Sequence, residues 1–317
     1  MAQFTVSICI PTCNRPGLLR EALHSCVEQT RKPDCILVGD DSANDATERM
    51  VWEFATGTHV PIDYKRNVPP LRQSANTNSL FDRTTTTHLM LLHDDDLLLP
   101  NAVEDLLACW AEYPNLTAAF GKQIVVSHDG ADDLPGSEGL NRAYFRSSEW
   151  AGLQANSWEV GVRQQFPNNG YMVLAATARA VRWRSEGEVG NAGDFDFGLR
   201  LGLTQEGFFF LDKYTTKVRL TESGSISTSS HDDASLHCYT LLEQCQLPAA
   251  GGEQLRSKRM AEVAPRAMMQ AVLHGHCKRA WEIYVSPYHG WRQRLSLGGI
   301  RRIFLLGLQA AGLWWQA

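Results

Sequence analysis

Three consecutive carboxylates interrupt a hydrophobic stretch of this sequence. Residues 88–100 read HLMLLHDDDLLLP, so that Asp94, Asp95 and Asp96 stand between two apolar runs. Adjacent carboxylates repel one another, and a divalent cation relieves the repulsion because oxygen ligands suit Mg²⁺ or Mn²⁺. These ions also keep coordination positions for water and a substrate phosphate. The triplet therefore predicts a metal site, and the alternative is a solvated acidic turn.

A second pair of carboxylates, Asp40 and Asp41, directly follows the apolar run CILVG at residues 35–39. Carboxylates at the carboxyl end of a parallel strand lie where open α/β sheets bind ligands. Turn formation and helix capping are the alternative roles of such a pair. Because the acidic triplet lies downstream, we favour ligand binding for both residues.

The segments that carry these acids alternate between strand and helix patterns. β-branched and apolar runs predict strands at residues 4–10, 35–39, 60–65, 89–92, 116–126, 208–212 and 217–220. Helices are predicted at residues 17–30, 46–54 and 73–81, and a loop at residues 127–141. Such alternation predicts an α/β fold with a doubly wound, mostly parallel sheet flanked by helices.

The composition is that of an ordinary globular protein. With 317 residues, 44% of them hydrophobic and 21% charged, the chain can bury a full core. Residues 250–317 carry ten Lys or Arg against three Asp or Glu, net +7, which leaves 20 against 32, net −12, for residues 1–249. The acidic body argues against nucleic-acid binding, and the basic tail requires its own explanation.

The cysteines and the N-terminal residues indicate a cytoplasmic protein. The eight cysteines show no CxxC pair and no metal-finger spacing, and Cys9 falls inside a predicted buried strand. These features favour a reducing compartment. The opening MAQFTVSICIPT has no basic segment followed by an apolar one, so we expect no signal peptide.

Three segments of the N-terminal half together resemble a known family. They are VSICIPTCNRPGLLREALHSCVEQT, CILVGDDSANDAT and LMLLHDDDLLLPNAVE, and they resemble the nucleotide-binding half of an inverting family 2 glycosyltransferase with the GT-A fold. The resemblance covers residues 4–230, and the combination is specific although a bare DxD is not. It implies a GT-A type, Rossmann-like catalytic domain at residues 1–231, followed by a helical, basic C-terminal region at residues 232–317.

The resemblance implies roles for residues around the nucleotide. Pro11, Thr12 and Arg15 match the loop that borders the base of a nucleotide sugar. Asp40 matches the carboxylate that accepts a hydrogen bond from the pyrimidine ring N–H, and Arg72 resembles the basic residue that reaches the nucleotide. The implied donor is therefore a nucleoside diphosphate sugar with a pyrimidine base.

Within the acidic triplet, Asp94 matches the residue nearer the ribose, and Asp95 matches the metal ligand. Many family members have DxDD here, whereas His93 stands where the first Asp often does. The ligand set therefore stays open, with Asp96 as a second candidate ligand beside Asp95. The implied cofactor is Mn²⁺ or Mg²⁺, which neutralises charge on the departing nucleoside diphosphate.

The segment GNAGDFDFGLRLG, residues 190–202, resembles the family's EDYDLWLRL-like segment, with Gly193 where the Glu often lies. By this match Asp194 is the catalytic base, because an inverting transfer needs one carboxylate to deprotonate the acceptor hydroxyl. Asp196 lies two residues further on, and we expect only one of the two to face the site. The alternative role for Asp194 is capping of the helix that follows.

The resemblance implies a metal-dependent enzyme that moves a sugar from a UDP- or dTDP-sugar to a hydroxyl acceptor with inversion, in bacterial surface polysaccharide or glycolipid synthesis. A nucleotidyltransferase is one alternative, but the N-terminal region has no Gly-rich phosphate loop with a lysine. A non-catalytic nucleotide-binding protein is another. It would keep Asp40 and lose Asp95 or Asp194, and all three are present.

The polar stretch SGSISTSSH at residues 223–231 lies where relatives place a loop near the diphosphate. His231, Asp232 and Asp233 are therefore candidates for the surroundings of the metal. Simple exposure to solvent is the alternative for all three.

The C-terminal segment RRIFLLGLQAAGLWW combines two arginines with an apolar run. At helical spacing one side is lined by Ile303, Phe304, Gly307, Leu308, Ala311, Trp314 and Trp315. The run is too short to cross a bilayer, which takes about 20 residues. Its basic start and terminal tryptophans suit a peripheral helix on anionic lipid, near a lipid-linked acceptor. The alternatives are a helix docked on the core or on the partner in a homodimer.

Overall fold

The computed structural model describes residues 4–127, 130–204, 207–219, 233–248 and 251–313. The chain divides into two compact units. The first comprises Met1–Arg184 and Phe197–Thr221, and the second comprises Ser185–Asp196 and Glu222–Ala317. The domain boundaries expected from the sequence, 1–231 and 232–317, stay a prediction.

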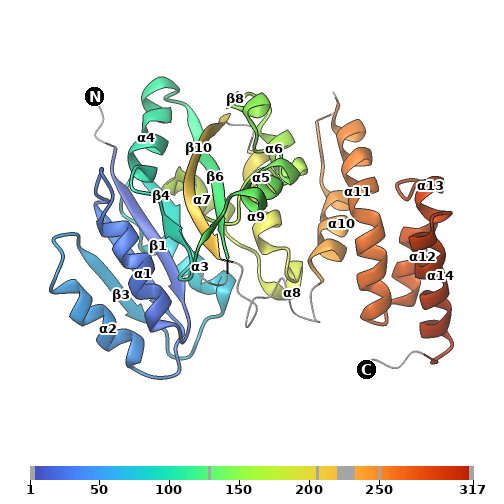
Figure 1. The fold of residues 1–317 in the computed structure, drawn as a ribbon, viewed down its shortest axis with the longest axis horizontal. Helices are drawn as coiled ribbons and strands as arrows, with labels where there is room; N and C mark the ends of the chain where they lie inside the picture. Colours follow the sequence, from blue (N-terminus) through green and yellow to red (C-terminus); the bar gives the residue numbers. More distant parts are fainter. Residues whose placement is uncertain (1–3, 128–129, 205–206, 220–232, 249–250, 314–317) are drawn as a thin grey trace. The chain divides into compact units, whose positions relative to one another are not determined.

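Within the described residues, the first unit is built on a sheet of ten strands. Figure 1 shows this sheet. Its strands are β1 (Val6–Thr12), β2 (Cys35–Asp40), β3 (Ile62–Arg66), β4 (His88–Leu91), β5 (Leu97–Leu98), β6 (Leu116–Val126), β7 (Asp132–Asp133), β8 (Gly152–Gln154), β9 (Tyr171–Leu174) and β10 (Gly207–Arg219). Neighbouring strands follow the order β3-β2-β1-β4-β9-β6-β10-β5, with β7 on β6 and β8 on β10.

Most strands of this sheet share one direction. The first four, β1 to β4, are parallel to one another. Strand β9 is antiparallel to both β4 and β6, so that β6 and its parallel partner β10 run the same way as the first four. Six of the ten strands are therefore co-directional, and the mostly parallel α/β sheet expected from the sequence is confirmed.

Helices cover both faces of the sheet. On one face, buried side chains join the strands to α1 (Pro16–Val27), α2 (Ala46–Ala55) and α4 (Ala102–Glu112). On the other face, a second cluster joins them to α3 (Gln73–Arg83), α6 (Ser157–Arg163) and α7 (Ala175–Val181). The unit also contains α5 (Leu134–Ala143) and a short 3₁₀ turn, Ser148–Trp150.

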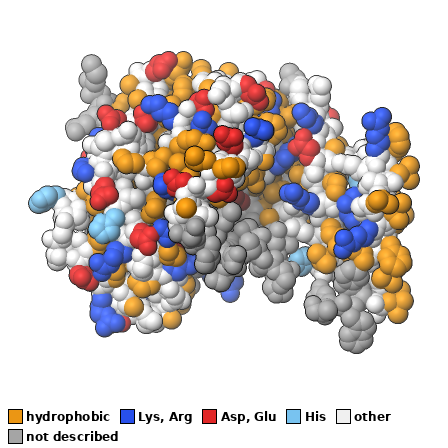
Figure 2. All heavy atoms as spheres, viewed as in Figure 1, with side chains coloured by type: hydrophobic (Ala, Val, Ile, Leu, Met, Phe, Trp, Pro, Cys, Tyr) orange, Lys and Arg blue, Asp and Glu red, His pale blue; other side chains and the backbone are white. Residues whose placement is uncertain are grey.

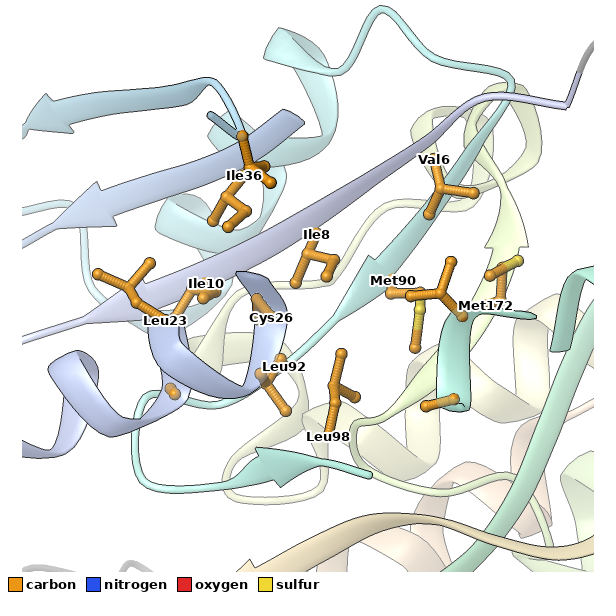
Figure 3. Packing of buried hydrophobic residues seen from close by; sticks show 14 of the residues in the cluster. Val6, Ile8, Ile10, Leu23, Cys26, Ile36, Met90, Leu92, Leu98 and Met172 are labelled. Carbon is orange, nitrogen blue, oxygen red and sulfur yellow. The ribbon is translucent and has the colours of Figure 1, made fainter. Parts of the chain in front are cut away.

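Strand β1 lies at the centre of the core. Its residues Ile8 and Ile10 belong to the first cluster, and Cys9 between them belongs to the second. Figure 3 shows the first cluster, in which Leu23 and Cys26 of α1 lie among the side chains of the sheet. This alternation explains the continuous apolar run in the sequence, because a parallel strand between two helical layers is buried on both faces.

Two segments differ from the sequence-based expectation. The two closing strands expected at residues 208–212 and 217–220 form one strand, β10, because its pairing with β6 continues across register shifts on both sides of Tyr214. Such bulges tolerate a polar stretch that breaks the apolar pattern. The loop expected at residues 127–141 contains β7 and α5, and the side chain of Asp133 caps α5 by accepting a hydrogen bond from the Gly136 N–H at 2.9 Å.

The second unit is helical. Its elements are α8 (Glu186–Val189), α10 (Ala234–Gln244), α11 (Gly252–Leu273), α12 (Cys277–Val285), α13 (Trp291–Arg294) and α14 (Leu297–Ala310). The division between the units falls inside α9 (Gly193–Gly202). None of the helices in the described ranges has both the length and the apolar character needed to cross a bilayer.

The end of β2 depends on a close approach between Gly39 and α3. A Cβ atom at Gly39 would overlap the Oδ1 of Asn76, whose Nδ2 donates a hydrogen bond to the Gly39 carbonyl at 2.8 Å. We expect Gly39→Ala to lower the free energy of unfolding by about 1–3 kcal/mol, as measured by urea unfolding. Gly17→Ala is the matched control, since nothing lies within 4 Å of its added methyl group. Equal stabilities of the two variants would contradict this packing argument.

Candidate functional site

The carboxyl ends of β1, β2 and β4 bring the acidic segments together at one edge of the sheet. The Thr12 hydroxyl donates to Oδ2 of Asp94 at 2.7 Å, and its carbonyl accepts from the Asp41 N–H at 2.9 Å. The Arg15 guanidinium lies 3.5 Å from Asp94 and 3.1 Å from Asp95. Residues from three separate segments therefore form one connected polar network, which starts directly after Pro11 in β1.

The three carboxylates of the triplet have different surroundings. Asp94 and Asp96 are buried, whereas Asp95 is partly exposed. Asp96 accepts two hydrogen bonds, one from the Arg219 backbone N–H at 2.9 Å and one from Asn169 Nδ2 at 2.8 Å. A solvated acidic turn would leave all three in water, so this simpler interpretation of the triplet is wrong.

Burial changes the protonation of the triplet. It raises the pKa of Asp94 from 3.8 to about 6, against the opposing effect of the Thr12 hydroxyl. It raises the pKa of Asp96 to about 7, and the neighbouring charge of Asp95 adds to this shift. Burial lowers the pKa of His93, so that its imidazole is neutral at pH 7. A bound cation would favour the charged form of both carboxylates and the neutral form of the imidazole.

The donor atoms at this edge fit a divalent cation. Ligand atoms of His93, Asp95 and Asp96 all lie within 4.8 Å of one another. In addition, Nε2 of His93 is buried without a hydrogen-bond partner, which is costly for a polar atom unless a ligand uses it. The sequence indicated Asp95 and Asp96 as metal residues and left His93 open. The geometry adds His93 as the third candidate ligand.

The raised pKa of Asp96 predicts how the stability of the metal-free protein depends on pH. The carboxyl binds its proton more tightly in the folded than in the unfolded chain, so its contribution to stability is complete below about pH 4 and is lost as the pH rises through 7. In EDTA, we expect the free energy of unfolding of the wild type, minus that of Asp96→Asn, to fall by roughly 2–3 kcal/mol between pH 5 and 8.

Urea unfolding at several pH values measures this difference. Burial lowers the pKa of His88 to about 4, so His88 makes stability rise with pH. Both proteins contain His88, so its effect cancels when their free energies of unfolding are subtracted. If the free energies of unfolding of the wild type and Asp96→Asn changed equally with pH, the raised pKa of Asp96 would be contradicted.

Asp40 and Asp41 lie at the same edge and hold the surrounding loop in place. Asp40 is fully buried, and its carboxylate accepts from the Ser42 N–H at 2.8 Å and from the Tyr64 hydroxyl at 2.7 Å. Asp41 accepts from Asn67 Nδ2 at 2.9 Å and from the Leu71 N–H at 3.0 Å. The bond to Ser42 is the turn chemistry considered as the alternative.

The contact with Tyr64 bears on base binding by Asp40. Burial and the bond to Asp40 both raise the pKa of the Tyr64 phenol, so that it stays a hydrogen-bond donor. Tyr64 and Ser42 thus occupy two of the acceptor positions of Asp40, which is fully buried. Base recognition by Asp40 stays a prediction.

Arg72 stands next to this loop with an exposed side chain. Its backbone has φ 69°, a conformation that costs a non-glycine residue of order 1–3 kcal/mol and often marks a binding site. The bond from the preceding Leu71 N–H to Asp41 fixes the chain just before it. Its predicted contact with the nucleotide stays a prediction.

Three residues of this edge were missed by the sequence analysis, namely Tyr64, Asn169 and Arg219. Asn169 precedes β9, whose antiparallel pairing sets Tyr171 opposite Leu91 and so brings the start of β9 to the end of β4. Arg219 ends β10, which runs in the direction of β4 and finishes at the same edge. The polar run PNNG before an apolar strand was the available signal for Asn169, but the direction of that strand was unknown.

The predicted base lies at the start of α9. Asp194 is half-buried and one residue inside the helix, with Oδ1 accepting from the Phe195 N–H at 2.8 Å. Asp196 is fully buried. A general base must reach the acceptor hydroxyl, so the exposure difference favours Asp194 over Asp196. The base role of Asp194 stays a prediction.

Of the three residues proposed near the metal after residue 222, His231 and Asp232 lie outside the described residues. Asp233 is described. Its Oδ1 accepts from the Asn191 N–H at 3.0 Å, and its Oδ2 lies 3.2 Å from Nε2 of His237. These contacts tie α10 to the segment that precedes α9.

Comparison with known proteins identifies the family of the N-terminal part of the chain. Residues 7–152 match the family described as Glycosyl transferase family 2. The chain carries a family 2 glycosyltransferase domain. A curated relative, "Uncharacterized protein MT1568" of Mycobacterium tuberculosis (strain CDC 1551 / Oshkosh), is 29% identical over 142 residues. That match covers 44% of this chain and 42% of the relative, so this chain spans less than half the length of that protein.

Solved structures resemble nearly the whole chain in fold. S. aureus TarS 1–349 in complex with UDP superposes with TM-score 0.63 at 12% identity, covering 99% of this chain and 93% of that one. The mannosyltransferase PcManGT from Pyrobaculum calidifontis, in complex with GDP-Man and Mn²⁺, gives TM-score 0.56 at 13% identity, covering 99% and 88%. Likeness at these identities establishes the fold, and the GT-A type expected from the sequence is confirmed.

Proposed function

We propose that this protein transfers a sugar from a nucleoside diphosphate sugar to a hydroxyl acceptor and uses a divalent cation to do so. The observation that carries the proposal is the network in which Thr12, Arg15 and the triplet meet at the carboxyl edge of a family 2 domain. Structural neighbours add support, since TarS was solved with UDP and with UDP-GlcNAc, and PcManGT with GDP-Man and Mn²⁺.

His93, Asp95 and Asp96 would hold the cation, Mn²⁺ or Mg²⁺. When bound, such a cation neutralises charge on the departing diphosphate. Asp96 is oriented for this role by Asn169 and the Arg219 N–H. The Arg15 guanidinium is about one third exposed, so that it can also reach phosphate oxygens, which its planar fork of donors suits.

The remaining steps are proposed from the family resemblance and from exposure. Asp194 accepts the proton of the acceptor hydroxyl as that oxygen attacks the anomeric carbon, and the transfer proceeds with inversion. We propose a pyrimidine donor, UDP- or dTDP-sugar, recognised through Pro11, Asp40, Asp41 and Arg72, and an acceptor in bacterial surface polysaccharide or glycolipid synthesis at the cytoplasmic face of the membrane.

Release of the nucleoside diphosphate tests this function. The protein is incubated with UDP-GlcNAc, UDP-glucose, a dTDP-hexose and GDP-mannose, each with Mn²⁺ or with EDTA. We expect release from one pyrimidine donor in Mn²⁺ and none in EDTA. Turnover of GDP-mannose alone would contradict the pyrimidine donor. Release of pyrophosphate from a nucleoside triphosphate, without turnover of any nucleotide sugar, would indicate the nucleotidyltransferase instead.

A further inference from the structure

The last helix of the second unit has one buried and one exposed apolar face. α14 packs against α11, α12 and α13 through Leu305 and Leu306, which are buried. On the other side, Leu297, Ile300 and Phe304 are 88%, 55% and 63% exposed. Their spacing of three and four residues puts them on one stripe of the helix. This stripe shares only Phe304 with the apolar face expected from the sequence, of which Trp314 and Trp315 lie outside the described residues. The burial of Leu305 and Leu306 agrees with the docked helix that was the alternative.

Exposed apolar side chains also concentrate in the elements that precede and follow α14 in the sequence. Of the thirteen large hydrophobic side chains that are exposed among the described residues, eight lie in the last three helices and their connections. These eight residues form what we call the C-terminal patch: Trp281, Val285, Trp291, Leu295, Leu297, Ile300, Phe304 and Leu313. Figure 2 shows orange hydrophobic and blue basic side chains together over α13 and α14. Such a concentration marks an interaction surface rather than scattered surface residues.

Basic side chains outnumber acidic ones around the C-terminal patch, where the exposed Glu282 lies next to Trp281. Residues 283–317 contain four arginines and no Asp or Glu. Arg301 is exposed on α14, and the Arg292 guanidinium lies 5.3 Å from the centre of the Trp291 ring. Arginines beside exposed aromatic rings suit a surface where apolar side chains enter hydrocarbon and cations meet anionic groups.

We propose that the C-terminal patch docks on an anionic lipid surface. α14 has 14 residues, so it lies in the plane of the interface and does not cross the bilayer. Phe304, Ile300 and Leu297 enter the acyl boundary, and Arg301 and Arg292 face the lipid phosphates. The proposal does not depend on the sugar transfer, although it would bring the protein to a lipid-linked acceptor.

A second copy of the chain fits the C-terminal patch less well. In a two-fold symmetric dimer the same patch faces itself, so the four arginines of residues 283–317 approach those of the partner, and residues 281–317 offer a single acid, Glu282, to offset them. Like charges across an interface oppose association. The excess of basic residues therefore favours an anionic bilayer over self-association.

Vesicle flotation with the full chain tests the proposal. We expect the protein to float with vesicles of equal parts phosphatidylglycerol and phosphatidylcholine at low salt, and not with phosphatidylcholine alone. Arg301→Glu changes the charge by two units and should lower partitioning on the order of thirty-fold, since each surface charge contributes about 1 kcal/mol. Phe304→Glu should also reduce it strongly. Neither exposed substitution is expected to unfold the protein, which circular dichroism checks.

Two controls match these variants. Lys258→Glu makes the same charge change at an exposed position of α11, and Leu134→Glu makes the same apolar-to-acidic change at an exposed position of α5. Both should float like the wild type. Absence of flotation with the anionic vesicles would overturn the proposal, as would equal losses in variants and controls. A dimer in light scattering that Phe304→Glu dissociates would assign the patch to self-association and would also overturn it. A catalytically inactive protein that still floats would refute only the proposed function.

Discussion

Asp194→Asn should lower kcat about 10³-fold and leave nucleotide affinity within about twofold of the wild type. Asparagine keeps the shape of the side chain and removes the lone pair basicity that accepts the proton. Asp194 lies in the first turn of α9 and is not among the residues of β1, β2 and β4 that are proposed to bind the nucleotide. Parallel measurement of sugar transfer and of nucleotide binding separates the two effects.

The matched control is Asp82→Asn, which makes the same change in an exposed ion pair with Arg182. Such pairs contribute about 0–1 kcal/mol, so activity and fold should be retained. Normal turnover by Asp194→Asn would show that another group takes the proton. If Asp196→Asn alone were inactive and folded, the buried carboxylate would be the base and the argument from exposure would be wrong.

Asp95→Asn should lower the affinity for Mn²⁺ by at least about 100-fold and make nucleotide binding independent of metal. Asp95 is the partly exposed member of the candidate ligand set, and its carboxylate lies 3.1 Å from Arg15. Asparagine removes one of the negative charges that offset the cation. The change in Mn²⁺ affinity is measured by calorimetry and by paramagnetic relaxation of water protons.

Asp105→Asn serves as the control, because this carboxylate pairs with Lys213 on the surface at 2.6 Å. It should leave metal affinity unchanged. His93→Ala adds a second observation, since it should also weaken Mn²⁺ binding if the imidazole is a ligand. Unchanged Mn²⁺ affinity in both Asp95→Asn and His93→Ala would contradict the proposed metal site.

The sequence predicted the first half of the fold because that half is local. The first three apolar runs are each followed by a predicted helix, so a shared direction of β1, β2 and β4 follows from this alternation. Which strands are neighbours comes from the structure. The edge at which Asp40 and Asp94 meet follows from the same alternation, since parallel strands end on the same side. The contact between Thr12 and Asp94 is a direct consequence of that geometry.

The second half of the sheet was less accessible from sequence. Strand β9 is antiparallel and β10 pairs with β6 over a long separation in the chain, and neither relation leaves a periodic signal. The partners of Asp96, Asn169 and the Arg219 N–H, come from these two strands and were missed for that reason. Burial of Asp94 and Asp96 likewise depends on distant segments, so the raised pKa values could not be read from the triplet.

The role of His93 shows a different limit. In the sequence, His93 was only a departure from the family motif. The sequence alone does not show which neighbours an imidazole side chain faces. The structure places a ring nitrogen of His93 within 4.8 Å of carboxylate oxygens of Asp95 and Asp96, which makes His93 a candidate ligand. Asp40 shows the opposite case. The family resemblance implied that this carboxylate recognises the base, but in the structure it is fully buried and accepts a hydrogen bond from Tyr64.

Calorimetric titration of the wild type with UDP, dTDP and GDP, each in Mn²⁺ and then in EDTA, tests the central claim most directly. The claim is that the carboxyl edge built from Thr12, Arg15 and the triplet binds a nucleoside diphosphate together with a cation. We predict that one pyrimidine diphosphate binds in Mn²⁺ and that its affinity falls at least about tenfold in EDTA. Absence of binding by every nucleotide in both conditions would contradict the claim.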